Sequence, residues 1–316
     1  MTELFLVMSP GPLTTVQDKG RFGYQHLGIP VSGALDAFAF QAANLLVGNP
    51  RESAVLEMTM VGAQLAVIRE ADVALTGAPM EMKLNSKPIE SWQSLRVRPG
   101  DMLSIQTVKS GCRGYLAVTG GIAVPEVMGS CSTYVGGKLG GYRGRPLRKG
   151  DIIHSGPGDL LQAQHHLPLS MIPQYTRDIS LRVLPGPQHD RFEKGQATFF
   201  KSKYLVSPQA DRMGLRLKGP PIAQNKELQE SIISEPTMPG SIQIPADSQP
   251  IILLSEQTVG GYAKIATVIS ADIHKIAQAK PGDSLRFDPI SLEHAHAIYR
   301  QEEEKLRQIS DILSKQ

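Results

Sequence analysis

Cysteine is nearly absent from this sequence, which contains only Cys112 and Cys131 in 316 residues. Two cysteines cannot build the disulfide framework of a secreted protein of this size, and they are typical of a chain in a reducing compartment. We interpret both as packing residues, because neither lies in a Cys/His cluster with the spacing of a zinc site. We therefore expect no metal site built from them.

Long apolar runs and blocks of like charge are missing as well. No stretch approaches the roughly 20 apolar residues that span a bilayer. The N-terminal segment 1–11 contains an acidic residue and a short apolar run, unlike a signal peptide. The formal net charge of +3 comes without a Lys/Arg run, so no nucleic-acid or membrane surface is predicted. We expect a cytoplasmic protein.

Several common catalytic motifs are also absent. Gly137-Lys138 is followed by Leu139 rather than by Ser or Thr, so this segment is not a nucleotide-binding P-loop. The glycine fingerprint of dinucleotide-binding folds and the serine elbow of hydrolases do not occur. No Ala-Met-Lys-Met-type attachment motif for biotin is present, so a biotin would have to come from another chain.

Glycine and proline are abundant, with 30 and 23 residues, and they separate many short apolar runs. This pattern predicts a mainly β protein. Helical spacing of apolar residues occurs over 35–49. It occurs again in the charged C-terminal segment at Ile298, Leu306, Ile309 and Leu313, which predicts an amphipathic helix.

Three spacing matches, in the same order in each half, indicate an internal duplication. They pair Arg21-x-Gly23-x4-Gly28-x-Pro30 with the same pattern at 212–221, Glu57-x-Thr59-Met60-x-Gly62 with 235–240, and Pro99-Gly100-Asp101 with 281–283. We therefore predict two related β-rich units, 1–160 and 179–290, with a linker over 161–178 and a C-terminal helix over 291–316. The flanks 14–17 and 32–36 have no counterpart in the second half, so we expect function specific to the first unit there.

Three loops combine glycines with polar residues: 14–36, 129–145 and 255–264. Backbone N–H groups in such turns bind anions, and neighbouring Arg or Lys side chains add charge. Phosphoryl or carboxyl groups are ligands that suit this composition. The same composition also suits tight corners of β-barrels that bind nothing. Residue types alone leave both interpretations open.

The chain also contains an ordered series of motifs: TTVQDKGRFGY, GIPVSGALD, LEMT, GYLAVTGGI, GGYRGRPLRKGD, VLPGPQ, DRMGLRLKG and QTVGGYAKIATVISAD. Together they resemble the biotin-dependent carboxyltransferase family over nearly the whole chain. This family includes the C subunit of 5-oxoprolinase, also called allophanate hydrolase subunit 2, and the antagonist of a sporulation-kinase inhibitor. The resemblance implies two cyclophilin-like β-barrel units.

The resemblance also implies an activity and partners. Family members act with a smaller, cyclophilin-like B subunit and with an A subunit in the ATP-dependent hydrolysis of 5-oxoproline to glutamate, with ATP and Mg²⁺ as the implied cofactors. One alternative is a biotin-dependent carboxyltransferase acting on a urea-like or amide substrate. Another is a non-catalytic regulator that binds a kinase-inhibitor protein. Cys131, Val259 and Ala263 depart from the family pattern, which leaves the substrate open.

Residue roles follow as hypotheses. Opening a lactam requires an electrophilic carbonyl, and phosphoryl transfer to it depends on positioning and cationic stabilisation. The expected catalytic residues are Arg21, Lys264, Asp18 and Glu57. The expected substrate-binding residues are Thr15, Gln17, Ser32, Asp36, Ser130, Thr133, Arg143, Arg145, Gln257, Gly260, Gly261 and Tyr262. The structural alternative for Asp18 and Arg21 is a loop-closing salt bridge.

Overall fold

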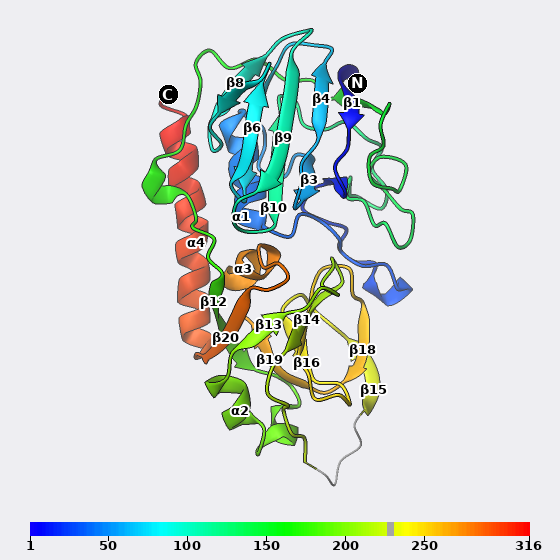
Figure 1. The fold of residues 1–316 in the computed structure, drawn as a ribbon, viewed down its shortest axis with the longest axis vertical. Helices are drawn as coiled ribbons and strands as arrows, with labels where there is room; N and C mark the ends of the chain where they lie inside the picture. Colours follow the sequence, from blue (N-terminus) through cyan, green and yellow to red (C-terminus); the bar gives the residue numbers. More distant parts are fainter. Residues whose placement is uncertain (226–230) are drawn as a thin grey trace. The chain divides into compact units, whose positions relative to one another are not determined.

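The computed structural model describes residues 1–225 and 231–316, and in them the chain is mainly β with four α-helices (Figure 1). The chain divides into two compact units. Unit 1 contains Met1–Arg21, Ser32–Tyr175 and Glu303–Gln316, and unit 2 contains Phe22–Val31 and Thr176–Glu302. The domain bounds predicted from the sequence stay a prediction. The division by contact differs from them in three places: it puts 22–31 in unit 2, it divides the predicted linker 161–178 at Tyr175 between the units, and it divides the C-terminal segment 291–316 at Glu302.

Two antiparallel sheets form unit 1 (Figure 1). The first has the order β11-β1-β4-β9-β6-β7, with β11 (Ile152–Ser155), β1 (Thr2–Ser9), β4 (Gln64–Val67), β9 (Met102–Val108), β6 (Met80–Leu84) and β7 (Lys87–Ile89). The second has the order β2-β3-β10-β5-β8, with β2 (Thr14–Gln17), β3 (Val55–Thr59), β10 (Arg113–Val118), β5 (Ala71–Gly77) and β8 (Ser94–Val97). Phe5, Leu65, Leu56 and Leu116 belong to one buried cluster, so both sheets contribute to a common core.

Strands β5 and β10 are buried at every position, because their second face is covered as well. Helix α1 (Ala37–Leu46) packs there, and Leu306, Ile309 and Leu313 of helix α4 (Leu292–Leu313) join the same cluster. These three residues are at most 4% exposed. The amphipathic C-terminal helix predicted from the sequence is therefore confirmed.

Unit 2 is built around a closed barrel (Figure 1). Its order is β12 (Asp178–Pro185), β19 (Lys264–Val268), β16 (Ser241–Gln243), β17 (Ile251–Leu253), β14 (Gly214–Lys218), β13 (Tyr204–Val206) and β20 (Ser284–Pro289). The closing pair, β12 with β20, is parallel. Strands β15 (Ser231–Pro236) and β18 (Val259–Tyr262) form a separate two-stranded sheet. Helices α2 (Gln196–Lys201) and α3 (Ile273–Ala277) complete the unit. The predicted mainly β fold is confirmed.

One turn recurs three times, at Gly100-Asp101, Gly150-Asp151 and Gly282-Asp283. The glycines have φ values of 91°, 89° and 88°, which L side chains rarely adopt. Each glycine N–H donates to the carbonyl of a valine, and the N–H of the same valine donates to the aspartate carbonyl. In chain order of the turns, the valines are Val67, Val7 and Val206. Each aspartate carboxylate accepts the N–H three residues earlier. Because unit 1 contains two copies, this turn alone does not pair equivalent positions of the two halves.

The Arg21–Pro30 spacing match also falls on unlike structure. Gly23 and Gly28 have φ values of 92° and 74° and flank a short 3₁₀ turn, Gln25–Leu27. Gly214, the counterpart of Gly23 by spacing, instead begins strand β14, and Gly219, the counterpart of Gly28, directly follows that strand. Arginine and glycine spacing therefore repeats without a repeat of backbone conformation at this place.

The turn at Asp151 differs from the turn at Asp101 by an ion pair with Arg145, so a substitution of Asp151 measures how much this pair adds to stability. Burial alone would raise the pKa of Asp151, but hydrogen bonds from the Arg145 side chain, at 2.8 Å to each oxygen, and from the Arg148 backbone lower it. We expect Asp151→Asn to lower the free energy of unfolding by about 1–3 kcal/mol at pH 7, the scale of charge-assisted hydrogen bonds. The depressed pKa makes this contribution complete above roughly pH 4 and lost as the pH falls further.

Urea unfolding at several pH values checks this prediction. The matched control is Asp101→Asn, which alters the same turn at an aspartate that pairs with no arginine side chain among the described residues. Its partners are the Asn85 side chain and the Arg98 backbone. The loss should be smaller for the control. Equal losses for the two variants, or a loss for Asp151→Asn that grows as the pH falls, would contradict the assignment.

Candidate functional site

Asp18 organises the first group of predicted site residues. Its carboxylate is 7% exposed and accepts hydrogen bonds from the backbone N–H of Gly20 at 2.8 Å and of Cys131 at 2.6 Å. It also accepts from the hydroxyls of Ser130, at 2.7 Å, and Ser132. These bonds hold the loop at 18–21 against the loop at 130–132.

Arg21 lies fully inside the same loops, at 1% exposure. Its Nε donates to the carbonyl of Val127 and its Nη2 to that of Ser132, both at 2.9 Å. Gly140 has to be glycine, because a Cβ there would lie 2.5 Å from Nη2. Burial lowers the pKa of Arg21, and the charge of Asp18 opposes this shift. Asp18 and Arg21 each form hydrogen bonds to the segment 127–132. Within the described part of the chain they form no ion pair with one another, so the loop-closing salt bridge considered above is not formed.

Four further predicted residues lie around this pair. Gln17 donates to the Thr15 hydroxyl at 2.9 Å and to the Thr133 carbonyl at 3.1 Å, and all three are at most 1% exposed. Ser32 is buried with φ at 56°. Gln17 Oε1, Arg21 Nη1 and Ser32 Oγ have no hydrogen-bond partner among the described residues. These atoms can accept from or donate to a ligand or a water.

Asp36 caps helix α1, and its other contacts also lie within the fold. Its Oδ1 accepts the N–H of Ala39 at 2.9 Å, and its Oδ2 accepts the Tyr175 hydroxyl at 3.0 Å. Its own N–H donates to the Tyr115 hydroxyl at 2.8 Å. Burial raises the pKa of both tyrosines, and the Asp36 carboxylate adds to this, so both hydroxyls stay protonated.

Glu57 lies next to this network, on strand β3 opposite Tyr115 of β10. Its Oε2 accepts the N–H of Leu35 at 3.0 Å, and its Oε1 is 3.8 Å from Arg113 Nε. Glu57 and Arg113 are 1% and 3% exposed. The carboxylate is therefore held inside unit 1 by a backbone donor and a buried cation.

Lys264 organises a second group, in unit 2. This lysine is 3% exposed and forms an ion pair with Glu235. Gln188 bridges the pair: its Nε2 donates to Glu235 Oε1 at 2.9 Å, and its Oε1 accepts the N–H of Lys264 at 3.0 Å. The hydrogen bonds from Lys264 and then Gln188 lower the pKa of Glu235. The Glu235 side chain is 38% exposed, so the pair reaches the surface.

The predicted glycines at 260 and 261 lie on β18, where Gly260 pairs with Glu235 of β15. A Cβ at Gly260 would be 2.0 Å from Gln243 Nε2. This amide nitrogen and the Thr237 hydroxyl are buried, and neither has a hydrogen-bond partner in the described residues. Gln243 is also the cross-strand neighbour of Lys264. The second group thus holds a cation beside two unsatisfied polar atoms.

The remaining predicted residues have other contacts. Tyr262 is 41% exposed, and Gln257 donates to the Val259 carbonyl at 2.6 Å. Arg145 pairs with Asp151 at 2.8 Å, and the Arg143 guanidinium lies 5.5 Å from the Tyr142 ring centre. Their expected role in substrate binding stays a prediction.

Gln25 is a contact that the sequence did not single out. Its Nε2 donates to the carbonyl of Thr237 at 2.7 Å and to that of Thr258 at 2.6 Å. The Gln25 side chain therefore connects the segment Phe22–Val31 to the residue that follows β15 and to the residue that precedes β18.

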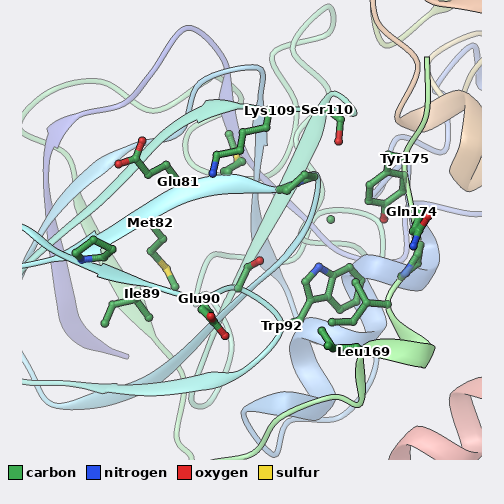
Figure 2. A pocket seen from close by; sticks show the side chains of 17 residues that line it. Glu81, Met82, Ile89, Glu90, Trp92, Lys109, Ser110, Leu169, Gln174 and Tyr175 are labelled. Atoms are coloured by element: carbon green, nitrogen blue, oxygen red, sulfur yellow. The ribbon is translucent and has the colours of Figure 1, made fainter.

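Unit 1 also contains a cavity of about 580 Å³ (Figure 2). Met80 and Met82 of β6 line it together with Trp92, Leu169 and Tyr175. None of the predicted site residues belongs to its lining. Over the residues that the structure describes, no group of three His, Cys, Asp or Glu could hold a metal, and no helix has the length and apolarity to cross a membrane.

Comparison with known proteins identifies the family. Residues 27–289 match the family described as carboxyltransferase domain, subdomain A and B. The chain belongs to this carboxyltransferase family.

Three relatives show how far the similarity extends. The chain is 39% identical over 295 residues to the 5-oxoprolinase C subunit of Escherichia coli, covering 92% of both chains. It is 35% identical over 301 residues to the 5-oxoprolinase C subunit of Haemophilus influenzae, covering 95% of both. The crystal structure of Kluyveromyces lactis urea carboxylase matches with a TM-score of 0.92 at 32% identity, over 98% of this chain and 29% of that protein.

The sequence missed Gln188 and Glu235 as neighbours of Lys264. Two signals for them were present: Gln188 ends the VLPGPQ motif, and Glu235 matches Glu57 in the duplication. For the cavity the signal was weaker, namely that Trp92 is the only tryptophan of this carboxyltransferase-family chain.

Arg21→Ala distinguishes a scaffold role from a chemical one. The guanidinium is buried and donates to two carbonyls, so its removal leaves acceptors without partners. We expect the free energy of unfolding to fall by about 2–4 kcal/mol, the cost of leaving one or two buried polar groups unsatisfied. The control is Arg143→Ala, whose exposed side chain predicts a change within about 0.5 kcal/mol. Urea unfolding measures both. A variant that unfolds like the parent chain but is inactive with its partners would assign Arg21 to the chemistry instead.

Proposed function

We propose that this chain is a subunit of an ATP-dependent 5-oxoprolinase that hydrolyses 5-oxoproline to glutamate with partner A and B subunits. The observation that carries the proposal is the match to two proteins named as C subunits of 5-oxoprolinase over 92–95% of both chains. A correspondence of this extent leaves little of either chain outside the alignment. The proposed location is the cytoplasm.

Lys264 is the residue for which the geometry best supports a chemical role. Its ammonium is buried, and the lowered pKa of Glu235 keeps a charged carboxylate beside it. A buried cation stabilises negative charge that develops on a carbonyl or phosphoryl oxygen more strongly than a solvated one. Glu235 and Gln188 fix the position of Lys264 and do not themselves need to contact substrate.

The proposal includes ATP and Mg²⁺, and the residues of this chain differ in how well they suit each. Among the described residues, Arg21 Nη1 and Ser32 Oγ are buried donors without hydrogen-bond partners, and such donors suit an anionic oxygen. They fit a phosphoryl or carboxylate group, and ATP would supply the phosphoryl group that activates the lactam carbonyl. The described residues offer no cluster for a divalent cation, so Mg²⁺ would be bound through the nucleotide phosphates.

The second candidate is a carboxyltransferase that uses biotin from another protein. The family description and the match to urea carboxylase favour it. The chain spans only 29% of that protein, so urea carboxylase activity is a proposal for this chain. Gln243 Nε2 and the Thr237 hydroxyl suit the carbonyl of a ureido or amide group.

The decisive experiment mixes this chain with candidate A and B subunits, 5-oxoproline and ATP. We expect ADP and glutamate to appear in the complete mixture and not when any one component is left out. No product in the complete mixture would refute the 5-oxoprolinase proposal. Avid binding of a biotinylated carrier, without ATP turnover that depends on 5-oxoproline, would then support the carboxyltransferase.

Lys264→Met tests the proposed chemical role within that mixture. The expected loss of kcat is about 100-fold or more, the scale for removing one group that stabilises transition-state charge. The matched control is Lys201→Met, an exposed lysine of unit 2 on α2. Unchanged turnover by a Lys264→Met complex that assembles normally would remove Lys264 from the chemistry.

A further inference from the structure

The cavity beside Trp92 has no role in the function proposed so far. Its volume of about 580 Å³ falls within the range of small-molecule sites, roughly 300–1,000 Å³. Figure 2 shows Met82 on one side and the Trp92 indole on the other, together with Leu169 and Tyr175. The walls are therefore mainly apolar and aromatic.

Trp92 is held in an uncommon backbone conformation. Its φ of 62° lies in the left-handed region, which is unfavourable for a bulky residue. Two backbone hydrogen bonds fix it: its N–H donates to Leu75 at 2.8 Å, and its carbonyl accepts from Leu167 at 3.1 Å. The ring centre is 6.2 Å from that of Phe38. Strain of this kind persists where the surrounding structure imposes it, and it concentrates at ligand sites.

The second aromatic ring is fixed as well. The Tyr175 hydroxyl donates to Asp36, which also caps helix α1, so the ring cannot turn freely. Both rings thus have set positions before any ligand binds. Such preorganisation reduces the entropy lost on binding.

Charge within the cavity is uneven. Lys109 has neither an ion pair nor a side-chain hydrogen bond within the described residues. Glu81 pairs with Lys83 at 2.8 Å, and the hydrogen bond from Lys83 is the main cause of its lowered pKa. Figure 2 shows Lys109 and Ser110 together on one side and the exposed Glu90 on the opposite side. The charge of Lys109 also contributes to the lowered pKa of Glu81, and Lys109 is the cation of the lining that an anionic ligand group could contact.

We propose that this cavity binds a small cyclic amide that carries a carboxylate. The ring would lie along Trp92 and Tyr175, the carboxylate at Lys109, and the amide at the polar side chains of Ser110 and Gln174. 5-Oxoproline belongs to this chemical class, so the choice of ligand rests on the proposed function. The cavity itself lies entirely within unit 1.

The single tryptophan makes the site directly observable, because all indole fluorescence of the chain comes from Trp92. Titration of the full chain with 5-oxoproline should give a saturable change in emission. 2-Pyrrolidinone, which lacks the carboxylate, should bind more weakly. Lys109→Met should weaken 5-oxoproline binding about tenfold or more, as expected for a lost charge-assisted contact, and leave 2-pyrrolidinone binding unchanged. The matched control is Lys149→Met, another exposed lysine of unit 1.

The outcomes separate this proposal from the proposed function. An emission that does not respond to 5-oxoproline, or equal effects of Lys109→Met and Lys149→Met, overturns the cavity assignment. The cavity is a binding site separate from the group around Lys264, since none of that group lines it. Product formation by the Lys109→Met complex in the complete mixture therefore leaves the 5-oxoprolinase proposal intact, whatever the emission shows. Saturable binding at Trp92 without turnover in the complete mixture supports the cavity and refutes the proposed function.

Discussion

The buried carboxylate of Asp18 is the constraint on which the loops of unit 1 depend. A carboxylate that leaves water is stable only when hydrogen-bond donors replace its hydration. Here two backbone N–H groups and two serine hydroxyls do so, and all but Gly20 come from the loop at 130–132. The Asp18 carbonyl also accepts the N–H of Ala34 at 2.9 Å, which holds the return of the opening loop. The same arrangement places the carbonyls of Val127 and Ser132 within hydrogen-bond distance of the Arg21 guanidinium.

The ion pair of unit 2 has a different character. In unit 1 the charged groups of the opening loop bind groups of their own fold. Lys264 instead pairs with a carboxylate whose side chain is 38% exposed, and it lies beside the unsatisfied amide of Gln243. Arg21 is enclosed at 1% exposure and donates to two carbonyls of its own loops, although its Nη1 has no partner among the described residues. The Lys264 ion pair instead reaches the surface through Glu235, where a ligand can contact it. This contrast is why the chemical role is proposed for Lys264 rather than for Arg21.

Residue composition predicted more of this arrangement than residue spacing did. Abundant glycine and proline and short apolar runs indicated the β fold, and the polar loops at 14–36 and 129–145 do meet through Asp18, Ser130 and Thr133. The Arg-Gly-Pro spacing does not mark equivalent backbone conformation, since Gly23 lies in a loop with positive φ and its counterpart Gly214 begins strand β14. The cavity could not be predicted, because its lining comes from segments near 80, 90, 109 and 170 that only the sheet topology and the returning chain bring together.

Unsatisfied buried atoms link stability to ligand binding in both units. Arg21 Nη1 and Ser32 Oγ in unit 1, and Gln243 Nε2 and Thr237 Oγ1 in unit 2, lack protein partners among the described residues. Each such atom costs about 1–3 kcal/mol unless something else satisfies it. Water can occupy such positions, and a ligand with carbonyl or carboxylate oxygens replaces that water with fixed contacts. A ligand that binds only the folded chain also stabilises it in proportion to the logarithm of its concentration over Kd. The atoms that weaken the free chain are therefore those through which a substrate with amide and carboxylate groups would strengthen it.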